Sequence, residues 1–81
     1  MQSNIDSIVD YLFTFSGVHY ISDMPRLPRS KRQTLARIVR TIPLDAAPLH
    51  AWNDAVCYLV HGSPSESRRE ARNTLIAALA A

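Results

Sequence analysis

Residues 4–17 read NIDSIVDYLFTFSG, and this stretch has the clearest periodicity in the chain. Its apolar residues recur at offsets of three and four, as they do on one face of an amphipathic helix: Ile5, Ile8, Val9, Leu12 and Phe13. Ser3 is suited to cap the first turn, and Gly17 can end the helix in the left-handed conformation. The stretch therefore predicts a helix from about Asn4 to Ser16.

The helical periodicity lapses in the segment that follows, residues 18–29. Pro25 and Pro28 each lack an amide hydrogen and restrict the preceding residue, which excludes a continuous helix there. The segment still carries several apolar residues. We therefore expect an extended, proline-containing connector that lies against the core.

A second helix is predicted over roughly residues 31–41. Ser30 and Gln33 have the spacing of a capping box, and Pro43 stops the helical pattern. Between them lies an apolar stripe formed by Leu35, Ile38, Val39 and Ile42.

Two further helices are expected in the second half of the chain. Asp45 is suited to cap a third helix, with Pro48 tolerated in its first turn and Gly62 at its end. The fourth is predicted from a serine cap, a proline at the first helical position and a glutamate three residues after the cap, which are Ser63, Pro64 and Glu66. The fold prediction is all-α: a compact bundle of about four short helices.

Size and composition limit the classes of protein that the chain can belong to. Its 81 residues are enough for one core, so residues 1–81 are expected to form a single helical domain. Cys57 is the only cysteine, which excludes an internal disulfide framework and favours a reducing compartment. No signal peptide and no membrane-spanning stretch is visible. A cytoplasmic protein without membrane association is therefore expected.

The charges are distributed unevenly along the chain. Nine basic and seven acidic residues give a net charge of +2, but six of the basic residues lie between Met24 and Leu44, a segment without an acidic residue. On a helical projection of residues 31–41 and the turn before it, five residues fall broadly opposite the apolar stripe: Arg29, Arg32, Gln33, Arg37 and Arg40. One side of this helix is expected to be buried and the other cationic.

Arginine and glutamine are suited to phosphate and base-edge contacts, so this helix is predicted to bind a negatively charged macromolecule. Of the two candidate partners, nucleic acid is favoured slightly over an acidic protein surface. The connection that follows, from Thr41 to Pro48, is longer than the tight turn of a helix-turn-helix motif. The alternative is a solvated helix face, some of whose arginines pair with Asp45, Glu66 or Glu70.

A second set of polar residues lies at helical spacing in the third helix: His50, Asp54, Cys57 and His61. Residues four apart on a helix can share a Zn²⁺ ion, but the ends of this set are too far apart for one tetrahedral site. We favour the simpler interpretation, in which Cys57 is a small buried hydrophobic residue and the histidines lie on a polar face. No metal and no cofactor are predicted.

No catalytic constellation is visible in the sequence, so the chain is not predicted to be an enzyme. Phe13 and Trp52 fit the inward faces of their helices, whereas Tyr11 and Tyr58 project toward polar sides and are predicted partner contacts. The leading hypothesis is a small regulatory binding protein that acts through its basic helix. The alternative hypothesis is a protein–protein interaction module that modulates a larger complex. One version of this module is a homodimer.

Overall fold

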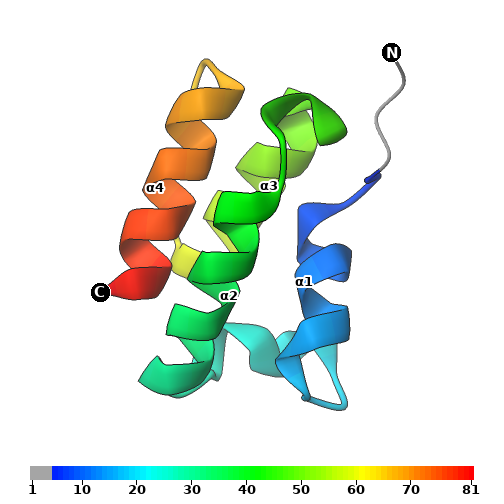
Figure 1. The fold of residues 1–81 in the computed structure, drawn as a ribbon, viewed down its shortest axis with the longest axis vertical. Coiled ribbons are helices and arrows are strands. Elements are labelled where there is room, and N and C mark those ends of the chain that lie inside the picture. The colour runs from blue at the N-terminus through cyan, green and yellow to red at the C-terminus, as the bar shows by residue number, and fades with distance from the viewer. Residues whose placement is uncertain (1–4) are drawn as a thin grey trace.

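The computed structural model describes residues 5–81, which form an all-α bundle (Figure 1). Within this range there are four α-helices, two short 3-10 helices and no strand. The elements are α1 (Ile8–Ser16), η1 (Ile21–Arg26), α2 (Arg29–Thr41), η2 (Leu44–Ala46), α3 (Leu49–Val60) and α4 (Arg68–Ala80). The predicted fold class, a bundle of about four short helices, is confirmed.

The four helices form a ring in which each helix packs against two others. α4 contacts both α2 and α3, and α1 contacts the same two helices from the other side. In Figure 1, α1 and α2 run in opposite directions, whereas α3 and α4 run in the same direction. The chain must therefore travel back along α3 before α4 can begin.

The buried apolar side chains form one cluster to which every α-helix contributes. Leu12, Leu35, Trp52 and Leu75 come from α1, α2, α3 and α4 in turn, and each is at most 2% exposed. Burying a side chain of this size stabilises a fold by roughly 1.5–3 kcal/mol. The apolar stripes predicted for residues 4–16 and 31–41 therefore supply part of the core, and α3, α4 and the connections supply the rest.

The first helix is shorter than predicted. It begins at Ile8, where the Ser7 side chain accepts a hydrogen bond from the Asp10 amide at 3.2 Å. The proposed cap, Ser3, lies outside the described residues. At the other end Gly17 has φ +78°, which confirms its predicted role as the left-handed residue that ends the helix.

Prolines stand at the starts of α2 and α3. Pro28 and Pro48 have extended backbones, and their carbonyl groups accept the first helical hydrogen bonds, from Arg32 at 3.0 Å and from Ala51 at 3.1 Å. The predicted caps were wrong, because Ser30 lies inside the first turn of α2 and Asp45 lies in η2. Proline suits this position because it loses no donor that the helix needs.

The connector after α1 was expected to be extended, and part of it, Ile21–Arg26, is the 3-10 helix η1. Met24 and Leu27 are buried in the core cluster, whereas Tyr20 is 71% exposed. η1 packs against both α1 and α3. It thereby places Arg26 beside the end of α3.

The fourth helix begins at Arg68, not at Pro64 as predicted. Ser67 caps it by accepting a hydrogen bond from the Glu70 amide at 3.2 Å. The preceding segment is held by Asn53 of α3, whose side chain bonds both backbone polar groups of Ser65. These bonds keep the backbone at Ser65 out of helical hydrogen bonding, so the cap signature at Ser63 does not start a helix.

Candidate nucleic-acid interface

The predicted binding residues lie on α2, whose opposite side packs into the core through Leu35 and Val39. Helical spacing separates the two sides, because residues three, four and seven apart share a face. The structure leaves Arg29, Arg37 and Arg40 exposed and Arg32 and Gln33 half-buried.

Three of these five residues line one hollow on the surface of the bundle. Gln33, Arg37 and Arg40 surround a space of about 280 Å³, together with Ala36 and with Ala80 from the end of α4. Arg37 and Arg40 thus stand beside the carboxyl end of α4, where unpaired helix carbonyls carry partial negative charge. The hollow gives a partner group a defined place between two guanidinium groups and one side-chain amide.

The other two predicted residues do not line this hollow. Arg29 lies in the first turn of α2, four residues before Gln33, and extends the same face. Arg32 is turned further inward, and its buried Nε has no hydrogen-bond partner within residues 5–81. Arg32 therefore contributes more to packing than to an open cationic surface.

The alternative in which these arginines pair with acidic side chains finds no support among the described residues. Across residues 5–81, no ion pair joins Arg29, Arg37 or Arg40 to an acidic group, including Asp45, Glu66 and Glu70. No acidic side chain therefore neutralises their charge in this part of the chain. A cationic face of this kind attracts anions over a distance of about one Debye length, roughly 8–10 Å in physiological salt.

The two predicted partner-contact tyrosines lie in different surroundings. Tyr11 is half-buried and stacks edge to face on Phe15, with ring centroids 5.3 Å apart. Tyr58 is 38% exposed and lines two hollows on the outer side of α3, neither of which includes Tyr11. The structure therefore does not bring the two tyrosines to one site.

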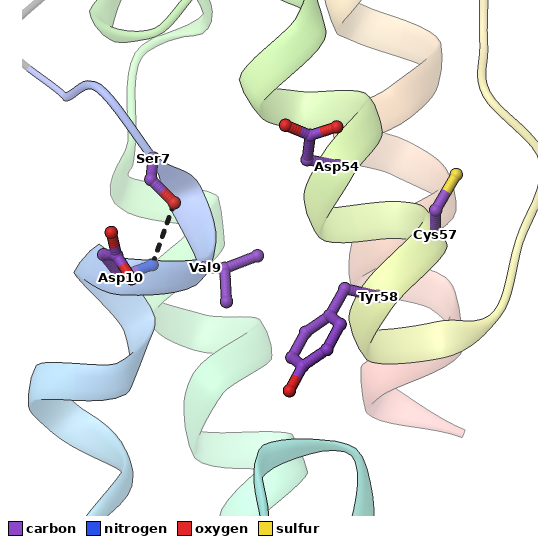
Figure 2. A pocket seen from close by; sticks show the side chains of 6 residues that line it. All are labelled: Ser7, Val9, Asp10, Asp54, Cys57 and Tyr58. Carbon is purple, nitrogen blue, oxygen red and sulfur yellow. Dashed lines mark hydrogen bonds between the residues drawn. The ribbon is translucent and has the colours of Figure 1, made fainter. Parts of the chain in front are cut away.

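The larger of these hollows, about 620 Å³, lies between the start of α1 and the middle of α3. In Figure 2, Val9 points from α1 toward α3, and the Tyr58 ring extends into the space between the helices. Ser7, Asp10 and Asp54 complete the lining with Cys57. Sequence patterns could not indicate this hollow, because its two walls are more than forty residues apart in the chain.

The polar residues of α3 lie on its outer face, as their spacing predicted. His50, Asp54, Cys57 and His61 are all exposed. The expectation that Cys57 is buried was wrong, because its position in the helix faces away from the stripe formed by Trp52, Val56 and Leu59. Among residues 5–81, no group of three or more histidine, cysteine, aspartate or glutamate side chains could hold a metal ion.

Along the described part of the chain, no helix is both long and apolar enough to cross a membrane. Comparison with known proteins found no matching protein family, no matching curated protein and no matching solved structure. Evidence for the function of the protein therefore comes from the geometry of its surface.

Proposed function

We propose that this protein binds nucleic acid, without catalysis, through the exposed face of α2. The observation that carries the proposal is the grouping of Gln33, Arg37 and Arg40 around one hollow, with both arginines free of ion pairs within residues 5–81. A guanidinium group donates two parallel hydrogen bonds to a phosphate, and glutamine can both donate to and accept from a base edge. The set combines positioning by charge with a group that can read a base.

The length of α2 supports contact with several phosphates at once. Its 13 residues span about 20 Å, at about 1.5 Å per residue, and Arg29 and Arg40 lie near its two ends. Each strand of DNA carries one phosphate per about 3.4 Å of helix axis, so several phosphates fall within this length. The connection from Ile42 to Pro48 contains η2 and is not a tight helix-turn-helix turn. We therefore propose contact mainly with the phosphate backbone.

Fluorescence anisotropy with labelled mixed-sequence DNA and RNA tests this proposal. The variant R37E/R40E reverses two charges at the hollow, and we expect it to weaken binding by at least about tenfold, because phosphate contacts dominate affinity. The matched control is R68E/R69E, which reverses two exposed charges in the first turn of α4. Circular dichroism verifies that both variants are folded.

The control variant is expected to bind distinctly better than R37E/R40E. Equal weakening by both variants would indicate a response to net charge alone and would contradict a site on α2. Undetectable binding of the unmodified protein to both nucleic acids at low salt would overturn the proposal and favour an acidic protein partner. Salt titration adds a second criterion, since about three phosphate contacts predict a log–log slope of roughly −3.

A further inference from the structure

A second surface, distinct from the exposed face of α2, lies on the outer side of α3. The two hollows lined by Tyr58 also share Cys57, so they are direct neighbours, and we call the pair the α3 groove. The second hollow, about 380 Å³, adds residues from η1 and from the end of α3: Ser22, Pro25, Arg26 and His61. Tyr58, with 38% of its surface exposed, lies between the two halves.

The two ends of the α3 groove carry opposite charge. Asp10 and Asp54 line the half between α1 and α3, whereas Arg26 lines the half at the end of α3. Asp54 and His61, which mark the two ends along the helix, are separated by seven residues or about 10 Å. No ion pair within residues 5–81 neutralises Asp10, Asp54 or Arg26.

A surface with opposite charges on either side of a central aromatic residue is complementary to itself after a two-fold rotation. In such an isologous contact, each residue of one copy meets the complementary residue of the other. An axis near Tyr58 would bring the acidic end of one groove to the basic end of the other, twice. The two Tyr58 rings would then lie close to the axis, where aromatic side chains contribute most to interfaces.

We propose that the α3 groove is a homodimer interface, with Arg26 of each copy facing Asp10 and Asp54 of the other and Tyr58 near the two-fold axis. The occupant of the groove is thus a second copy of this chain. The proposal is independent of nucleic-acid binding, because neither half of the groove includes a residue of α2. It leaves the hollow at Arg37 and Arg40 open in the dimer.

The test uses size-exclusion chromatography with light scattering over a range of protein concentrations, with the unmodified protein and two charge-reversal variants. D10R/D54R replaces both carboxylates of the acidic end and so makes both ends of the groove basic, and R26D makes both ends acidic. Each variant alone is expected to be monomeric, because like charges would face each other twice. An equimolar mixture is expected to regain the mass of a dimer, because every contact between the two variants is again between opposite charges.

Cys57 provides an independent measurement at the same place, since it is exposed and lines both halves of the α3 groove. A short bismaleimide should cross-link the unmodified protein and the D10R/D54R plus R26D mixture into dimers. It should cross-link neither variant alone, and C57S supplies the background. Three outcomes would overturn the proposal: an unmodified protein that is monomeric at its highest soluble concentration, single variants that remain dimeric, or a mixture that stays monomeric while circular dichroism shows both variants folded.

Discussion

Asn53 holds the backbone of Ser65 with both ends of its side-chain amide. The amide nitrogen donates to the Ser65 carbonyl at 2.9 Å, and the amide oxygen accepts from the Ser65 amide at 2.8 Å. The two residues are 12 positions apart, and the contact fixes the segment that returns along α3 before α4 begins. One side chain in the second turn of α3 therefore helps to hold the segment that lets α3 and α4 run in the same direction.

Replacing Asn53 with alanine is expected to lower the free energy of unfolding by about 1–3 kcal/mol, because two polar backbone groups of a half-buried residue lose their partners. Urea unfolding followed by circular dichroism measures the change. Ser65→Ala is the matched control, because the contact uses only the backbone of Ser65, and it should stay within about 0.5 kcal/mol of the unmodified protein. Equal effects of the two substitutions would show that the contact does not stabilise the fold.

The start of α4 gives a second prediction. Ser67→Ala should cost about 1 kcal/mol, since the hydroxyl group caps the helix by accepting from the Glu70 amide. Ser63→Ala should change stability by only a few tenths of a kcal/mol, because Ser63 is exposed and lies outside the helix. The same unfolding experiment separates them, and a larger effect at Ser63 would place the helix start where the sequence pattern did.

These two serines show how far sequence reasoning reaches in this chain. Both are followed three residues later by glutamate, so local chemistry allows either to cap a helix. In the structure Asn53 bonds the backbone of Ser65, between the two serines, and Ser67 caps the helix; the contact from Asn53 leaves no periodic trace in the sequence. Local signals were sufficient at Gly17, where one residue ends the helix by its own backbone conformation.

The candidate site likewise has a part that the sequence predicted and a part that only the tertiary structure shows. Helical spacing was enough to place Arg29, Arg37 and Arg40 on the exposed face of α2, because a helix converts sequence offset directly into direction. It could not indicate that Ala80 would close the hollow beside Arg37 and Arg40, since this requires the packing of α4 on α2. The α3 groove could not be predicted from the sequence for the same reason, because it requires the packing of α1 and η1 on α3.

Gly62 provides a third prediction, which concerns close packing. A Cβ atom at this position would lie 2.7 Å from Cγ1 of Val56, a residue that is fully buried and stiff about its single χ angle. Gly62→Ala is therefore expected to cost about 1–3 kcal/mol through overpacking. In a Val56→Ala background the same substitution should cost distinctly less, because the obstructing methyl group is gone.

Gly17→Ala is the comparison for this double-mutant cycle. Its φ of +78° makes alanine costly by roughly 1–2 kcal/mol for a backbone reason, and that cost should be the same with valine or alanine at position 56. An equal cost of Gly62→Ala in both backgrounds would show that contact with Val56 is not the cause. Urea unfolding of the six proteins provides all the required differences.

Arg32 distinguishes between packing and binding within α2. Its Nε is buried without a hydrogen-bond partner in the described part of the chain, so Arg32→Met removes an unsatisfied donor while methionine retains much of the apolar stem. We expect the free energy of unfolding to remain unchanged or to rise by up to about 1 kcal/mol. Arg37→Met removes an exposed guanidinium group at the hollow and should leave stability within about 0.5 kcal/mol.

For nucleic-acid affinity, Arg37→Met should have the larger effect of the two substitutions. Arg37→Met should weaken binding severalfold, because one phosphate contact is lost and the salt slope falls by about one. Arg32→Met should have a smaller effect, because Arg32 is half-buried and its Nε is buried. Anisotropy titrations at two salt concentrations measure both effects. A greater loss from Arg32→Met, with the fold intact, would mean that the binding face of α2 is rotated toward Arg32 and away from the hollow at Arg37.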